Sequence, residues 1–153
     1  MRGDTATLDT PAGRVFAGGF DDPHLDTTVL PDPASVAPRV SSGGAEGSSE
    51  GAGGSTDAVL HLGVVHAPYL AALDVLVDAG HDLLLAGHTH GGQVRLPGIG
   101  ALTANCDLPL DQARGLSAYR GRSLHVSPGL GHNRYFPFRF ACRPEATLLE
   151  LTG

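Results

Sequence analysis

The chain has 153 residues, the length of one ordinary domain, and its 41% hydrophobic and 17% charged residues are typical of a globular protein. Its 22 Gly and 11 Pro imply many turns and exclude a mainly helical protein. A formal net charge of -6 argues against nucleic acid as the main partner, because such binding depends on Lys or Arg contacts to phosphates. No apolar stretch approaches the roughly 18 residues of a membrane helix, and residues 1–4 lack the apolar run of a signal peptide, so we expect a cytoplasmic protein without a transmembrane segment.

The charge is distributed unevenly along the chain. Residues 1–82 carry 12 acidic residues and 3 arginines, a formal charge of -9, whereas residues 83–153 carry 4 acidic residues and 7 arginines, a charge of +3. All ten basic residues are arginines, which suit bidentate binding of phosphate or carboxylate. A genome that prefers arginine codons explains the same bias.

The first sixty residues predict a hairpin and a flexible insertion. Residues 5–8 and 14–20 are expected to be two short strands, joined through Pro11-Ala12-Gly13 and followed by an acidic loop at 21–32. Residues 41–56 contain no large apolar side chain and cannot offset the entropy of ordering. We therefore predict one domain over residues 1–153 that carries a flexible Gly/Ser-rich insertion at 41–56.

A strand, a helix and a second strand are predicted between residues 58 and 86. Residues 58–65 form an apolar run of strand length, and residues 82–86 form the next strand. Between them a helix is predicted that begins at Pro68 and ends at Gly80 as its C-cap. Its apolar face consists of Leu70, Leu73, Leu76 and Val77. Such a βαβ unit makes the two strands parallel neighbours. Their carboxyl ends then lie at the same edge of the sheet.

Four further strands and a short helix are predicted between residues 93 and 151. Further strands are expected at 93–96, 124–127, 138–142 and 147–151, with a short helix around 111–116. The last two strands are expected to pair through Arg143-Pro144-Glu145. The predicted fold class is therefore α/β, with mixed sheets, one clear βαβ unit and a C-terminal β-hairpin.

A histidine cluster stands at the predicted strand ends. His88 and His90 lie in the string Ala86-Gly-His-Thr-His-Gly-Gly-Gln93, and His66 ends the preceding strand. In an extended segment, residues i and i+2 point the same way, so His88 and His90 would present their rings from one face, with their backbones about 7 Å apart. This pattern favours a metal site, because glycines leave room for an ion beside the chain. His61 is expected to be a core or edge residue, and His81 to interact with the helix carboxyl end.

At this point the chain resembles the calcineurin-like metallophosphoesterases, in particular a bacterial branch with the signature seen here at 86–93. The resemblance extends to Gly18-Gly-Phe-Asp-Asp-Pro-His-Leu25, Val65-His-Ala-Pro-Tyr69, Asn105-Cys-Asp-Leu108, Ser127-Pro-Gly-Leu-Gly131 and the close from Arg143 to Leu149. Only the insertion at 41–56 falls outside it.

The resemblance implies a metal-dependent phosphoesterase. Members of the family hold two divalent metals, commonly Mn, Fe or Zn, at the carboxyl edge of a sheet inside an αββα sandwich, and the metals bind phosphate and activate a water. By resemblance, His66 and His88 would ligate one metal and His90 the other. Arg95, Arg134 and Arg139 lie near the signature or the Gly-rich loop at 127–133, and we treat them as candidates for contacting the phosphate of a phosphomonoester or phosphodiester substrate, with solvated surface arginines as the alternative.

The chain departs from the family in its upstream motifs. The family pattern begins with Asp-x-His, continues with an apolar strand into Gly-Asp, and then shows Gly-Asn-His, which supplies further ligands and the histidine that assists the leaving group. Asp22-Pro23-His24 has the spacing of the first motif, but the order of the later segments assigns it to a loop before the His66 strand. The chain therefore resembles only the carboxyl-terminal half of a phosphoesterase, without an identified general acid, and association with another chain would complete its fold.

Two other readings stay open on the sequence. The chain is then either a non-catalytic metal-binding or partner-docking fragment that lacks the upstream Asp and Asn ligands, or a mononuclear zinc hydrolase that uses His66, His88 and His90. The zinc hydrolase has no identified general base.

Overall fold

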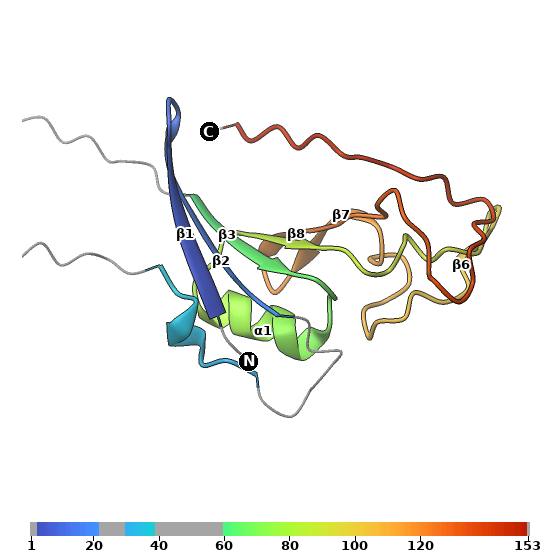
Figure 1. Cartoon of the computed structure of the whole chain (residues 1–153), viewed down its shortest axis with the longest axis horizontal. Coiled ribbons are helices and arrows are strands. Elements are labelled where there is room, and N and C mark those ends of the chain that lie inside the picture. Colours follow the sequence, from blue (N-terminus) through green and yellow to red (C-terminus); the bar gives the residue numbers. More distant parts are fainter. Residues whose placement is uncertain (1–2, 22–29, 39–59, 153) are drawn as a thin grey trace, which may run out of the picture.

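The computed structural model describes residues 3–21, 30–38 and 60–152, so the predicted insertion at 41–56 and the residues Asp22 and His24 lie outside the described residues. The described part forms a mixed α/β fold with a six-stranded sheet in the order β1-β2-β3-β4-β8-β7 and a two-stranded sheet of β5 and β6 (Figure 1). The elements are β1 (Gly3–Thr10), β2 (Gly13–Phe20), the short 3-10 helix η1 (Pro33–Ser35), β3 (Leu60–Val65), α1 (Leu70–Asp78), β4 (Leu83–Ala86), β5 (Arg95–Leu96), β6 (Gly100–Ala101), β7 (Gly115–Tyr119) and β8 (Arg122–Val126).

The strand directions place several strand ends at one edge of the large sheet. The four central strands β2, β3, β4 and β8 run parallel to one another, and the outer strands β1 and β7 pair antiparallel with β2 and β8. The predicted N-terminal hairpin is confirmed, and its strands are longer than expected, because the pairing extends from Thr10↔Gly13 to Gly3↔Phe20. The predicted βαβ unit is also confirmed, since β3 and β4 are parallel neighbours joined through α1.

Tertiary hydrogen bonds fix both ends of α1. At its start, the backbone amide of Leu70 donates to Asp107 Oδ1 at 2.8 Å, so a carboxylate lies at the positive end of the helix. At its end, the amides of Gly80 and His81 donate to the carbonyls of Val77 and Leu76, which is the Schellman arrangement expected for a C-cap glycine. Of the predicted apolar face, the terminal Leu70 is 37% exposed. No helix in the described part of the chain has the length and apolarity needed to cross a membrane.

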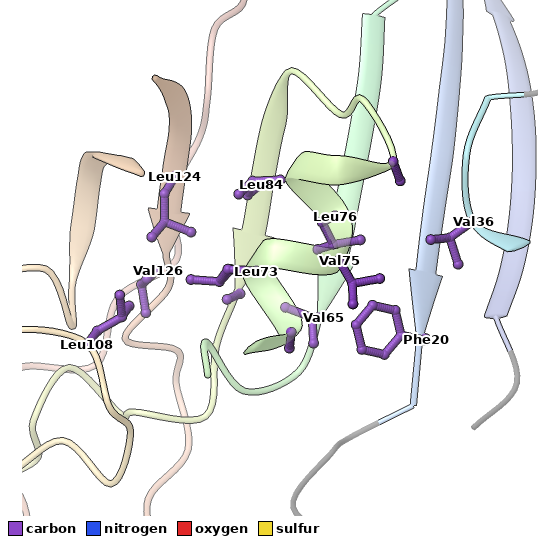
Figure 2. Packing of buried hydrophobic residues seen from close by; sticks show 13 residues of the cluster. Phe20, Val36, Val65, Leu73, Val75, Leu76, Leu84, Leu108, Leu124 and Val126 are labelled. Atoms are coloured by element: carbon purple, nitrogen blue, oxygen red, sulfur yellow. The ribbon is translucent and has the colours of Figure 1, made fainter. Parts of the chain in front are cut away.

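The hydrophobic core lies between α1 and one face of the sheet (Figure 2). Leu73 and Leu76 of α1 are fully buried against residues of β3, β4 and β8, including Leu84 and Leu124. Replacing a fully buried leucine by alanine costs about 2 to 5 kcal/mol. Since the isolated nine-residue helix would be marginal in water, packing holds it in place.

A hairpin replaces the helix predicted around 111–116. Residues from Gly115 form β7, which pairs with β8 through a two-residue turn at Arg120 and Gly121, with φ of 47° and 78°. Two positive φ angles define the tight turn that matches the twist of paired strands. The Arg120 guanidinium also pairs with Asp74 at 2.7 Å and Asp78 at 3.0 Å, so the turn is tied to α1.

The predicted C-terminal hairpin is wrong. The backbone of Phe140 exchanges hydrogen bonds of 3.0 Å with Gln93 and Arg95 and forms only an isolated bridge to Val94. Residues 147–151 form no strand, and Leu148 is 95% exposed. In Figure 1 this terminal segment, in red, runs back along the sheet on the side away from α1.

His81 contacts the helix end through its backbone amide, as predicted for this position, whereas its imidazole is buried in the core. Its ring stacks on Phe16 with centroids 6.0 Å apart, and its Nε2 lies 3.1 Å from the carbonyl oxygen of Val36. Because a carbonyl only accepts, Nε2 carries the proton of the neutral ring. Burial lowers the pKa of His81, the Val36 carbonyl opposes this shift, and the charges of His61 and Asp82 act in opposite directions. The expectation that His61 lies at the sheet is confirmed, since it belongs to β3 and pairs with Asp82 at 3.2 Å.

The neutral state of His81 predicts an acid-sensitive fold. Below pH 6.5 the imidazole of the unfolded chain takes up a proton that the folded chain excludes, so the free energy of unfolding falls as the pH drops through this region. The variant His81→Gln keeps an N–H donor near Val36 but does not titrate. We therefore expect its melting temperature to depend less on pH than that of the wild type between pH 6.5 and about 5. The control His132→Gln, at an exposed position, should leave the slope unchanged. Equal slopes for wild type and His81→Gln would contradict this assignment.

Candidate metal centre

The ends of β3 and β4 bring two histidine rings into contact. His66 follows β3 directly, His88 follows Gly87 at the end of β4, and the amide of Gly87 donates to the carbonyl of His66 at 2.9 Å. The Nε2 atom of His66 lies 3.1 Å from the Nδ1 atom of His88, with ring centroids 5.0 Å apart. A metal ion about 2.0 to 2.1 Å from two imidazole nitrogens holds them roughly 2.9 Å apart at a right angle and 3.4 Å apart at the tetrahedral angle. As the structure stands, this separation is a hydrogen bond between the two rings, and the same distance lies within the range for two ligands of one ion.

The backbone of the signature segment is turned rather than extended, which corrects the sequence prediction. His88 and His90 adopt left-handed conformations with φ of 64° and 49°, and Gly91 and Gly92 continue with 67° and 65°. A Cβ on Gly92 would lie 2.3 Å from the Cβ of Ala101, so only glycine fits there. The turned backbone cannot present His88 and His90 as i and i+2 residues of a strand.

Buried hydrogen bonds hold this unusual backbone. The Thr89 hydroxyl donates to the carbonyl of Ala113 at 2.8 Å and accepts from the amide of Gly91 at 3.2 Å. The Cys142 thiol lies 3.3 Å from the carbonyl oxygen of His90. Non-glycine residues with positive φ are uncommon, and they persist where the surroundings over-determine them. The segment therefore presents both rings from a rigid frame.

His90 lies close to the loop around Gly131, since a Cβ on that glycine would be 3.9 Å from Cε1 of His90. Burial is the main cause that lowers the pKa of His90, and the positive charges of Arg139, His132 and His66 act in the same direction. The neutral imidazole is the form that ligates a metal. A charge on His66 acts on His90, so these two histidines are close enough to interact electrostatically.

Asn105 contacts the cluster, and sequence reasoning gave it no role. Its side-chain Nδ2 lies 2.9 Å from Nε2 of His88, the ring nitrogen that does not face His66, and an amide nitrogen donates, so Nε2 accepts in this arrangement. The segment that begins at Asn105 belongs to the family resemblance, and this was the available signal. A partner of this kind orients a ligating histidine and fixes which ring nitrogen carries the proton.

The three arginines proposed for substrate binding lie in different environments. Arg139 donates to the carbonyls of Pro128 at 2.7 Å and of Gly131, and so clamps the loop between them. Arg95 donates to the carbonyl of Gly91 at 2.9 Å. The guanidinium of Arg134 lies 4.9 Å from the ring centroid of Tyr135. Arg95 and Arg139 thus support the backbone of the cluster.

A cavity of about 480 Å³ opens beside the cluster. His88 and His90 line it, together with Asn105 and a set of apolar side chains from 94 to 104 and Phe136. Across residues 3–21, 30–38 and 60–152, no three His, Cys, Asp or Glu side chains form a group that could hold a metal ion. Within the described residues, the cluster is thus a pair of contacting histidines with His90 nearby.

Comparisons with known proteins identify relatives of the chain. It is 41% identical over 81 residues to phosphodiesterase YaeI of Escherichia coli (strain K12), an alignment that covers 51% of this chain and 28% of that protein. It is 37% identical over 98 residues to the uncharacterized metallophosphoesterase YkuE of Bacillus subtilis (strain 168), covering 63% and 32%. For the uncharacterized metallophosphoesterase YkoQ of the same strain the identity is 33% over 92 residues, covering 60% and 33%.

The chain thus spans about a third of the length of the curated relatives it matches. No protein-family model matches the sequence, and no solved structure gives a significant match. Through 51% to 63% of its length, the chain is related to the metallophosphoesterase family.

Proposed function

We propose that the chain is the carboxyl-terminal portion of a metal-dependent phosphoesterase that hydrolyses phosphomonoesters or phosphodiesters. The observation that carries this proposal is the separation of 3.1 Å between Nε2 of His66 and Nδ1 of His88 at the carboxyl edge of parallel strands. The relatives named metallophosphoesterase and phosphodiesterase support the same chemistry.

In this proposal each histidine has a defined role. His66 through Nε2 and His88 through Nδ1 hold one divalent ion, and His90 contributes to a second. When bound, the ions stabilise negative charge on the phosphate and lower the pKa of a water molecule so that it attacks phosphorus near neutral pH. The water oxygen would form a bond to phosphorus as the bond from phosphorus to the ester oxygen breaks, and the released alkoxide would take up from solvent a proton equivalent to the one that the water gave up.

Ligation by His88 assigns a role to Asn105. A cation at Nδ1 requires the proton of the ring on Nε2, and the side chain of Asn105 accepts a hydrogen bond from that N–H when its amide presents Oδ1. The structure presents Nδ2 to this ring nitrogen, and a half turn of the amide would present Oδ1 in its place. Asn105 therefore holds the ring of His88 in the orientation that faces His66.

The rest of the site is proposed to come from polypeptide beyond the described residues. The Asp and Asn ligands of the family pattern are missing from the matched segments, and the relatives are about three times as long as the matched portion. We infer that the described sheet is part of an αββα sandwich and that the complete site holds two ions, Mn, Fe or Zn. Arg134, which neighbours the cavity-lining Asn133, is the arginine that we retain as a proposed phosphate contact.

A second function is favoured by the same missing motifs. A chain without the Asp-x-His, Gly-Asp and Gly-Asn-His ligands would bind a metal through His66 and His88 without hydrolysing esters. The two functions are separated by measuring bound metal and turnover on one preparation of the gene product that contains this sequence. About two ions per chain with turnover supports the enzyme, and one ion without turnover supports the binding fragment.

The first prediction concerns His66. Replacing it removes one of two nitrogens that share an ion, so we expect His66→Ala to lower Mn²⁺-dependent hydrolysis of bis(p-nitrophenyl) phosphate by about 100-fold or more, in line with the loss of several kcal/mol of charge stabilisation. Equilibrium dialysis should show at least one ion fewer per chain.

The matched control is His61→Gln, which changes a histidine within β3 that pairs with Asp82 and not with the cluster. It should retain the metal content and the rate within about twofold, a change of less than half a kcal/mol. Full metal content and full activity in His66→Ala would reject the assignment of His66 as a ligand.

The second prediction concerns Asn105, which has a φ of 49° and is therefore replaced by residues that tolerate this backbone. Asn105→Gly removes the partner of His88 and should weaken Zn²⁺ binding by about 10-fold or more. Asn105→Asp keeps an acceptor for the Nε2–H and should bind at least as tightly as wild type. Competition with a chromophoric chelator measures both, and equal weakening in the two variants would show that Asn105 has only a packing role.

A further inference from the structure

The cavity beside the histidines combines a polar end with an apolar wall. Its volume of about 480 Å³ lies within the range of roughly 300 to 1,000 Å³ that small-molecule sites occupy. His88 and His90 line it, and so do the apolar side chains of Val94, Leu102 and Phe136. A ligand bound to the histidines through its phosphate would thus have its organic group against apolar side chains.

The polar groups of the lining are largely engaged within the protein. The Gln93 amide donates to the carbonyls of Phe136 and Phe138, and its Oε1 accepts from the amide of Asn133 at 2.9 Å. The Thr89 hydroxyl donates to the carbonyl of Ala113. A sugar or nucleoside placed in this cavity would lose its hydrogen bonds to water and gain few in return, which is unfavourable.

The lack of charged side chains among the described lining residues also favours a ligand whose phosphate is at the histidines and whose organic group is uncharged. None of the described residues that line it is Arg, Lys, Asp or Glu. A phosphate inside the apolar part would therefore be desolvated without a counter-charge. The phosphate belongs at the histidine end, and the remaining volume belongs to an uncharged group.

We propose that this cavity binds the apolar alcohol group of the phosphoester substrate, so that the enzyme prefers esters of apolar alcohols to esters of sugars or nucleosides. This inference rests on the proposed phosphoesterase function. Burial of one methylene group is worth about fourfold in affinity, and Leu102 is 53% exposed, so we expect a gain of about two- to fourfold in kcat/KM for each methylene that the cavity covers.

The test uses the Mn²⁺-loaded gene product that contains this sequence and a series of p-nitrophenyl phosphodiesters of ethanol, butanol, hexanol and octanol, with the p-nitrophenyl diester of thymidine 5′-phosphate as the polar comparison. We expect kcat/KM to rise from the ethyl to the octyl ester. We expect kcat/KM for the thymidine ester to be lower than that of alkyl esters of similar size. A flat series, or a preference for the thymidine ester, would overturn the proposal.

Two variants assign the effect to the cavity. Leu102→Asn replaces an apolar lining residue by a polar one of similar shape, and it should lower the octyl-to-ethyl ratio of kcat/KM by about 10-fold, which corresponds to losing the cover of two methylene groups. Ile99→Asn makes the same kind of change at a residue that is 76% exposed and lines a separate cavity with Arg95. It should leave the ratio unchanged, and equal effects in both variants would overturn the proposal.

Failure of the proposed function is recognised separately. If none of the esters is hydrolysed, calorimetric binding of hexyl phosphate and ethyl phosphate to the Mn²⁺-loaded protein still tests the cavity, and equal affinities would overturn it. A further arm offers vesicles of dioleoyl phosphatidylglycerol. Their hydrolysis would support lipid esters as the source of the apolar group, and their inertness beside rapid turnover of the octyl ester would support soluble apolar esters.

Discussion

The contact between His66 and His88 depends on two parallel strands that end at the same edge of one sheet. β3 and β4 are paired in parallel through Leu62↔Leu83 to Val64↔Leu85, and each reaches its histidine within two residues of the strand end. The crossover helix α1 determines this geometry, because its buried face packs on the sheet and both of its ends are fixed by hydrogen bonds. Packing of the core therefore sets the distance between the two imidazole nitrogens.

The loops beyond the sheet complete the presentation of the rings. The left-handed backbone at His88 and His90 is stabilised by Thr89 and Cys142, and Asn105 arrives from a separate loop to contact His88. These contacts join segments that are far apart in the sequence. A rigid frame of this kind lowers the cost of organising ligands when a cation binds.

Much of the fold could be predicted from hydrophobic pattern and turn residues, because the N-terminal hairpin and the βαβ unit follow local rules. The hairpin of β7 and β8 could not, since its turn uses Arg120 before Gly121 where Asn or Asp is usual. Residues 147–151 have the composition of a strand, but pairing depends on a partner that local sequence does not reveal.

In the site too, some features could be predicted from the sequence and others depend on tertiary contacts. The meeting of His66 and His88 followed from strand order, whereas the left-handed backbone of His88 depends on buried contacts from Ala113 and Cys142 that no local pattern encodes. Asn105 escaped prediction for the same reason, because its partner lies 17 residues away across a turn.

The claim that His66 and His88 share one cation is tested most directly by following the imidazole nitrogens of the ¹⁵N-labelled protein by NMR during a Zn²⁺ titration. The account predicts that Nε2 of His66 and Nδ1 of His88 shift together on addition of the first equivalent, and that the shift of His88 weakens when His66 is replaced. Coordination of His88 through Nε2, or shifts of His88 that persist unchanged without His66, would contradict it.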